Sequence, residues 1–123
     1  MTNLRADGLQ MYRELMPGSL PEDDGEVDFH TGFAPELMDI GVESVFGRLW
    51  TRQGLSKRDR SLVTLGMLIA LRSSEELTAH FRIARTNGLT DSELAEVVYH
   101  ATGYVGFPAA NTARMAAERA FEG

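Results

Sequence analysis

The chain has 123 residues, of which 43% are hydrophobic and 24% are charged. This length fits one domain, and the composition is that of an ordinary globular protein rather than a disordered or fibrous one. The 18 acidic side chains outnumber the 12 basic ones, which gives a formal net charge of -6. A chain of that sign offers no general attraction for phosphate backbones, so nucleic acid is not an expected partner.

The sequence contains no cysteine, which excludes disulfides, thiolate metal ligands and thiol nucleophiles. Its first residues, MTNLRADGLQ, lack the basic and then apolar pattern of a signal peptide. The longest apolar run lies within SLVTLGMLIAL and is far shorter than the roughly 20 residues that cross a bilayer. We therefore expect a cytoplasmic protein with no membrane-spanning segment.

The first half of the chain predicts two helices joined by an acidic loop. Apolar residues recur at helical spacing over residues 4–16, and Pro17 ends the pattern. Residues 19–33 are acidic and turn-rich, and we interpret them as an extended loop, either a lid or a mobile connection. Pro35 then opens a second helix that runs to Trp50. Its expected apolar stripe consists of Leu37, Ile40, Val45, Phe46 and Leu49.

The third and fourth predicted helices have marked ends. Ser56 caps a helix containing SLVTLGMLIAL, which is apolar nearly all round, so we expect this helix to be buried, in part against another subunit. The next helix lies within EELTAHFRIARTNG. Ser73 or Ser74 caps its start, and the dipeptide of Asn87 and Gly88 ends it.

Two more helices complete the pattern. Thr90 and Glu93 form a capping box at the start of the fifth helix, and Pro108 opens an alanine-rich sixth. Six predicted helices without a convincing strand indicate an all-α bundle, and we expect a single domain over residues 1–123. The short connections between the later helices favour antiparallel neighbours.

Glu76 and His80 on the fourth predicted helix are candidates for chemistry. They lie four residues apart, so they share one helix face, and Arg72 extends the same ridge. Leu77 and Phe81 fall on the neighbouring face, which places the pair at the boundary between core and solvent. A carboxylate there can orient one imidazole nitrogen and leave the other as an acid or base. The same spacing also fits a simple surface ion pair, and both interpretations remain open.

The two other histidines give no sign of a metal centre. Neither His30 nor His100 stands at ligand spacing from His80, so we expect no metal site. His100 follows an apolar run, where a hydrogen-bonded structural role is the default. His30 lies in the acidic loop, where we expect a solvated side chain.

Two blocks of the chain resemble the carboxymuconolactone decarboxylase family: FGRLWTRQGLSKRDRSLVTLGMLIAL and EELTAHFRIARTNGLTDSELAEVVYHATGYVGFPAANTA. The resemblance begins at about Phe46 and extends to the end of the chain. It implies an alkylhydroperoxidase-like bundle of about six helices. It also implies a ring-like homohexamer, a trimer of dimers, with active sites near subunit contacts.

The resemblance favours the decarboxylase branch of this family. In the peroxidase branch a CxxC pair precedes the matching histidine, whereas Ser73 and Glu76 occupy those places here. The implied activity is cofactor-independent decarboxylation of a small carboxylated lactone such as 4-carboxymuconolactone, with a role in aromatic catabolism. His80 would be the general acid/base, oriented by Glu76. The candidate substrate-binding residues can pair with a carboxylate or form a pocket wall: Arg58, Arg72, Arg82, Trp50 and Tyr104.

The N-terminal part departs from the pattern of this branch. Decarboxylases of this branch have an arginine, a VLG turn and a histidine-valine-x-arginine segment in this part of the chain. The present sequence has Tyr12, MPGS and LPEDDGE in those places. The usual ALGR turn is also replaced, because Arg72 and Ser73 follow Leu71. The alternatives are another lactone or unsaturated-acid rearrangement in a biosynthetic pathway, or a non-catalytic oligomeric ligand-binding module. If the acidic loop lies over the pocket, we expect a substrate with fewer carboxylates than 4-carboxymuconolactone.

Overall fold

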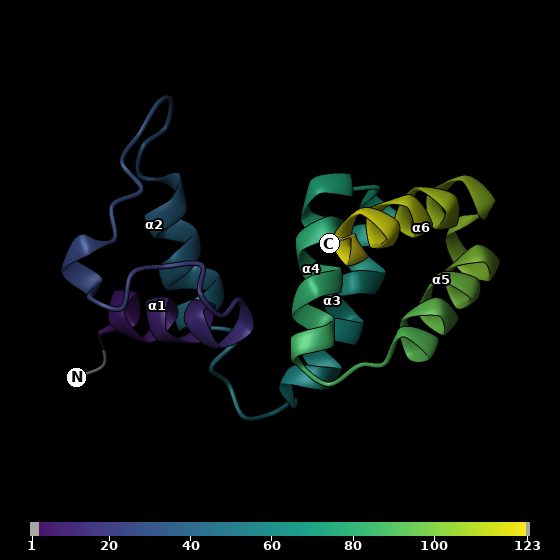
Figure 1. Ribbon diagram of the computed structural model, residues 1–123, viewed down its shortest axis with the longest axis horizontal. Helices are drawn as coiled ribbons and strands as arrows, with labels where there is room; N and C mark the ends of the chain where they lie inside the picture. Colours follow the sequence, from purple (N-terminus) through teal and green to yellow (C-terminus); the bar gives the residue numbers. More distant parts are fainter. Residues whose placement is uncertain (1–2, 123) are drawn as a thin grey trace. The chain divides into compact units, whose positions relative to one another are not determined.

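The computed structural model describes residues 3–122, and within them the chain forms six α-helices, a π-helical segment, a short 3-10 helix and no strand (Figure 1). The predicted all-α class and the six helices are confirmed. The chain divides into two compact units, Met1–Gly54 and Leu55–Gly123. No helix in the described part of the chain is long and apolar enough to cross a membrane.

The first unit is built on α1 (Leu4–Leu15) and α2 (Leu37–Gly41), which continues directly into the π-helical segment η2 (Val42–Gly47). Asn3 caps α1, because its side-chain oxygen accepts a hydrogen bond from the backbone N–H of Ala6 at 3.1 Å. The helix η2 packs along α1, and the buried side chains between the elements include Leu9, Val27 and Val42.

The apolar stripe predicted for the second helix is wrong at four of its five residues, whereas Phe46 is half-buried and packs edge-on against Tyr12 with ring centroids 5.1 Å apart. Leu37, Ile40, Val45 and Leu49 are all exposed, whereas Val42 is buried. For Val45 and Leu49 the reason is the change of helix type, since a π-helix pairs each N–H with the carbonyl five residues back and so rotates these side chains off the α-helical face.

Two glycines allow the backbones of α1 and η2 to touch. A Cβ on Gly8 would lie 2.2 Å from the carbonyl oxygen of Val42. A Cβ on Gly47 would lie 2.4 Å from the carbonyl oxygen of Leu4. Both distances are below any real Cβ contact, so only glycine permits this approach.

We expect Gly8→Ala to lower the free energy of unfolding of the first unit by about 1–3 kcal/mol, because the added methyl must displace backbone atoms of Val42. Urea denaturation followed by the fluorescence of Trp50, the one tryptophan in the chain, measures the effect. Gly41→Ala is the matched control, since a Cβ there meets no atom within 4 Å. Equal midpoints for both variants would contradict the close approach.

The loop that was predicted to be extended is folded onto α1. It contains the 3-10 helix η1 (Asp24–Glu26), and Arg13 holds Asp24 in an ion pair at 2.8 Å. Arg5 donates a hydrogen bond to the carbonyl oxygen of Val27 at 2.9 Å. These bonds fix the middle of the loop.

His30, which was predicted to be merely solvated, has a partner in the first unit. Its Nε2 lies 2.6 Å from a carboxylate oxygen of Asp39, although about half of the side chain stays exposed. Arg5 approaches the other oxygen of the same carboxylate at 3.4 Å. Asp39 therefore joins the loop to α1.

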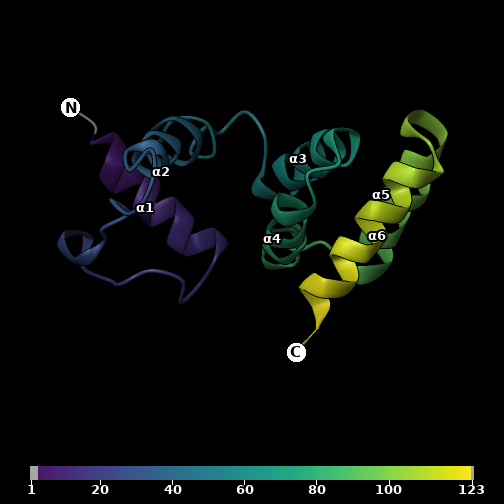
Figure 2. The same ribbon diagram turned by 90° about the horizontal axis from the view of Figure 1, so that it is seen from above.

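The second unit contains α3 (Lys57–Leu71), α4 (Ser74–Thr86), α5 (Asp91–Val105) and α6 (Phe107–Phe121). Figure 2 shows α3 beside α4 and α5 beside α6, and α4 also packs on α6. Buried apolar side chains from these helices and from the turn before α5 form its core: Leu65, Ile69, Leu77, Phe81, Ala84, Leu89, Leu94, Ala109, Ala113, Ala116 and Ala120.

The predicted helix ends of this unit are largely confirmed. The Ser56 side chain accepts a hydrogen bond from the N–H of Asp59 at 3.0 Å, and Thr90 and Glu93 form the full capping box of α5. Gly88 has a φ of +97° just after α4, which suits a residue without a Cβ. Ser73 precedes α4 as its N-cap but makes no capping hydrogen bond through its side chain.

The expectation that α3 is buried holds for only one of its faces. Leu65 and Ile69 are fully buried in the core of the unit. Val63, Met67 and Leu71 are 46%, 61% and 74% exposed. The apolar composition of α3 therefore exceeds what this unit covers, since a helix packed on one side buries only a stripe.

Candidate functional site

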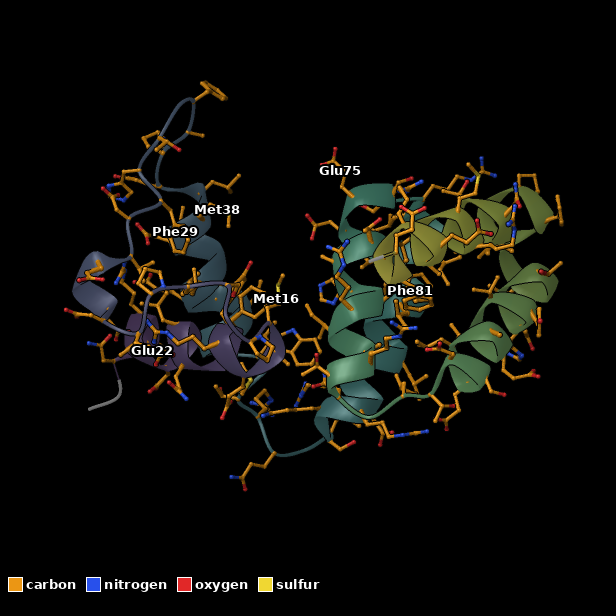
Figure 3. The ribbon with its side chains drawn as sticks, viewed as in Figure 1. Met16, Glu22, Phe29, Met38, Glu75 and Phe81 are labelled. Carbon is orange, nitrogen blue, oxygen red and sulfur yellow. The ribbon has the colours of Figure 1, made fainter. Side chains whose placement is uncertain are left out.

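The pair of Glu76 and His80 lies on the outer edge of α4. Glu76 is exposed, and His80 is half-buried. The neighbouring face of α4 carries Leu77 and Phe81 (Phe81 is labelled in Figure 3), both fully buried. Phe81 packs edge-on against Phe121 of α6 with ring centroids 6.0 Å apart. The predicted position of the pair, between core and solvent, is confirmed.

The surroundings of His80 favour its neutral form. Burial removes water from the imidazolium ion and lowers the pKa of His80 below the ordinary value of 6.5, while the negative charge of Glu76 opposes this shift. The unfolded chain therefore binds more protons than the folded chain between the lowered pKa and 6.5. The contribution of His80 to the free energy of unfolding rises with pH through that window and is constant above it.

We expect the His80 ring to titrate below pH 6.5, and at a still lower pH in the Glu76→Gln variant, because the opposing charge is lost. The three histidines give three imidazole signals, which NMR titration follows separately. Glu75→Gln is the control, since Glu75 projects away from the other helices of its unit at the start of α4 (Figure 3). A His80 pKa that is unchanged by Glu76→Gln would contradict this electrostatic coupling.

Arg72 does not extend the ridge of Glu76 and His80, which corrects the prediction from spacing. It follows the end of α3 in the left-handed region, with φ 55° and ψ 39°. Its N–H and that of Ser73 bond back to carbonyls of the last turn of α3. The chain therefore reverses here, and α4 begins only at Ser74. An i, i+4 relation has no meaning across such a turn.

The two other candidate arginines have partners within the second unit. Arg82 donates to the carbonyl oxygen of Ala120 at 3.1 Å and so satisfies the C-terminal end of α6. Arg58 forms an ion pair with Glu93 of α5. Trp50 is buried and belongs to the first unit.

A groove between α3 and α5 is the larger of the two cavities described in the second unit, with a volume of about 550 Å³. Its apolar lining comes from both helices and from Leu89: Leu62, Gly66, Ile69, Leu89, Val97 and Ala101. The polar lining residues are Arg58, Glu93, Glu96 and His100. No residue of α4 lines this groove, so it is separate from the Glu76–His80 ridge.

The groove brings together Glu96, which the sequence analysis overlooked, and His100, for which it expected a structural role. Glu96 and His100 stand four residues apart on α5, the same spacing as Glu76 and His80 on α4. This repeated spacing was the available signal. His100 is exposed rather than held in a structural role, and the ring of Tyr104 lies 5.0 Å from its ring. Tyr104 itself is 80% exposed.

Within residues 3–122, no three acidic or histidine side chains lie close enough together to hold a metal ion. Asp39 has His30 as a partner, and Glu93 has Arg58.

Comparison with known proteins identifies the family. The pattern of the carboxymuconolactone decarboxylase family matches residues 35–119, which is well over half of the chain. The chain belongs to this family. The match covers the ridge on α4 and the whole groove between α3 and α5, and it begins earlier than the resemblance that was expected from about Phe46 onward.

Two proteins of similar sequence are decarboxylases. The chain is 43% identical over 77 residues to a 4-carboxymuconolactone decarboxylase of Acinetobacter baylyi, an alignment that covers 63% of this chain and 58% of the relative. It is 36% identical over 89 residues to a nitrosuccinic acid decarboxylase of Metarhizium robertsii, covering 72% of this chain and 62% of the relative. In both cases this chain spans less than two thirds of the relative's length.

Proposed function

We propose that the chain is a cofactor-independent decarboxylase of a small carboxylated substrate, acting in the cytoplasm. His80 is its general acid/base, and Glu76 orients the imidazole. The observation that supports this proposal most directly is the half-buried His80, with a lowered pKa and a carboxylate one helical turn before it, in a chain of this family. Perturbed titratable groups at the edge of a core are typical of functional sites.

The relatives suggest the chemical class of the substrate. In 4-carboxymuconolactone, loss of CO₂ breaks a carbon–carbon bond, and the electron pair passes through the conjugated alkene to the lactone carbonyl oxygen. In nitrosuccinic acid the nitro group can accept the pair in the same way. Both reactions end when a proton is added to carbon. We infer a substrate in which a carboxylate lies next to an electron-accepting group, as in the lactones of aromatic catabolism.

The neutral resting state of His80 fits this sequence of steps. An anionic substrate beside the imidazole would raise the pKa of His80, in the same direction as the charge of Glu76 does. Binding would thus favour the protonated form of His80 before CO₂ leaves. The imidazolium then stabilises the developing oxyanion and returns the proton to carbon.

Arg72 is the favoured ligand for a substrate carboxylate among the three candidate arginines. It is exposed and stands at the turn that leads into α4, whereas Arg82 and Arg58 are bonded to other groups of the unit. A guanidinium in this place presents a planar fork of donors to both carboxylate oxygens.

The proposal is tested by turnover of 4-carboxymuconolactone and, separately, nitrosuccinic acid in buffer containing EDTA. We expect release of CO₂ from at least one of them, at a rate that EDTA leaves unchanged. Disappearance of the lactone without CO₂ would replace the proposal by the alternative of a rearrangement. Failure of both substrates would contradict the inferred substrate class and favour a ligand-binding module.

We further propose that the chain forms a homohexamer, a trimer of dimers. The support is the exposed apolar stripe on α3, formed by Val63, Met67, Ala70 and Leu71, since a face of this kind is usually covered by another subunit. Light scattering at micromolar concentration should give a mass several times 13.6 kDa. Met67→Glu should lower that mass, and a wild-type monomer would contradict the oligomer.

A further inference from the structure

The groove between α3 and α5 has the size and lining of a small-molecule site. Its volume of about 550 Å³ lies within the range of ligand pockets, roughly 300–1,000 Å³. Leu62, Ile69 and Val97 contribute apolar surface, and a few polar side chains converge on the same space. Apolar surface with a small number of placed polar groups is the usual composition of such sites.

Two of the charged side chains that line the groove neutralise each other. Arg58 of α3 is paired with Glu93 of α5. Glu93 is further fixed by the capping box, because it accepts a hydrogen bond from the N–H of Thr90 at 3.0 Å. The backbone hydrogen bond from Thr90 and the ion pair with Arg58 together hold the pKa of Glu93 below its ordinary value, so this carboxylate stays ionised beside Arg58.

Glu96 is left as the uncompensated charge of the groove. It is exposed, and it makes no hydrogen bond or ion pair to any group in residues 3–122. His100 lies one turn further along the same face of α5 and also lines the groove. The ring of Tyr104, tilted by 35° at 5.0 Å, supports one side of the imidazole. The groove therefore combines the carboxylate of Glu96 and the imidazole of His100 with an apolar lining.

We propose that this groove is a second ligand site, separate from His80, which binds a small organic cation with a compact apolar body. The apolar body lies against Leu62, Ile69 and Val97. The cationic group, such as a protonated amine, pairs with Glu96 and donates a hydrogen bond to a ring nitrogen of His100. The same charge would repel a substrate that carries several carboxylates, so this site does not depend on the proposed decarboxylation.

The test uses three probes of the same ring size and different charge: benzylamine, benzyl alcohol and benzoate. Each is titrated into the full chain at pH 7.5 while NMR follows the imidazole signals, with His100→Gln identifying the signal of His100. We expect benzylamine to shift the His100 signal saturably and to bind most tightly of the three. The signals of His30 and His80 should stay in place.

Variants then test the charge that selects the ligand. Glu96→Gln should weaken benzylamine binding about tenfold, since it removes the charged partner of the ammonium group while keeping the shape of the side chain. Glu75→Gln, on another helix and outside the groove, is the matched control and should leave the affinity unchanged. Circular dichroism confirms that each variant is folded.

Three outcomes would overturn the proposal. The first is benzoate binding as tightly as benzylamine, and the second is benzylamine binding that Glu96→Gln does not weaken. The third is the absence of any shift at His100, which would also be found if another subunit covered the groove. None of these outcomes bears on the turnover assay for decarboxylation, so the two proposals fail separately.

Discussion

The His80→Gln variant is expected to lose turnover of the native substrate by at least about 100-fold, the smallest effect typical of losing a general acid or base. Glutamine keeps a hydrogen-bonding side chain of similar length but cannot carry the proton. The loss should appear in kcat rather than in KM alone, because proton transfer to carbon belongs to the chemical step. Steady-state kinetics of the purified variant, with release of CO₂ as the readout, measures it.

The Glu76→Gln variant separates a positioning role from a structural one. We expect a loss of similar size, together with a shift of the basic limb of the pH–rate profile to lower pH, because the protonated form of His80 is the reactive one and Glu76 raises its pKa. Glu75→Gln is the control, because it also removes one carboxylate charge, at the residue before Glu76. This variant should keep near wild-type activity. If His80→Gln and Glu76→Gln both melt at the wild-type temperature and retain full activity, the assignment of this pair is wrong.

The largest expected effect on stability belongs to Phe81→Ala, which should cost about 3–5 kcal/mol. Phe81 has no exposed surface, and its ring meets that of Phe121 edge-on. Its removal leaves a cavity at the junction of α4 and α6, where the surrounding helices can close only in part. Urea denaturation followed by circular dichroism at the helical band provides the measurement.

The same substitution at an exposed phenylalanine supplies the control. Phe33 is fully exposed, so Phe33→Ala should change the free energy of unfolding by no more than about 0.5 kcal/mol. A loss at Phe81 no larger than that at Phe33 would contradict the burial of Phe81 and the arrangement of the core around it.

Local chemistry in the sequence determined where most helices begin and end. The capping oxygen of Ser56 and the capping box of Thr90 and Glu93 act on N–H groups two or three residues away. Gly88 ends its helix through its own backbone freedom. Such signals need no partner from elsewhere in the chain, which is why the six helices were predicted correctly. The shared face of Glu76 and His80 is of the same local kind.

Contacts between distant residues decided the path of the second helix. Its π-helical segment lies where Gly8 meets Val42 and where Gly47 meets Leu4. Each of these pairs is more than thirty residues apart in the sequence, so the hydrophobic pattern of residues 35–50 contains no sign of the contact. The apolar stripe read from an α-helical period therefore pointed to the wrong face.

Tertiary structure also decided what the charged candidates do. The sequence predicted Arg58 and Arg82 as candidate substrate ligands, but packing of α3 on α5 and of α4 on α6 brings each of them to a partner within the unit. Glu96 and His100 repeat the local spacing of Glu76 and His80, yet only the approach of α3 to α5 gives them an apolar groove to face. Spacing along one helix fixes which of its side chains are neighbours. The groove that Glu96 and His100 line exists only because α3, some thirty residues earlier in the sequence, packs beside α5.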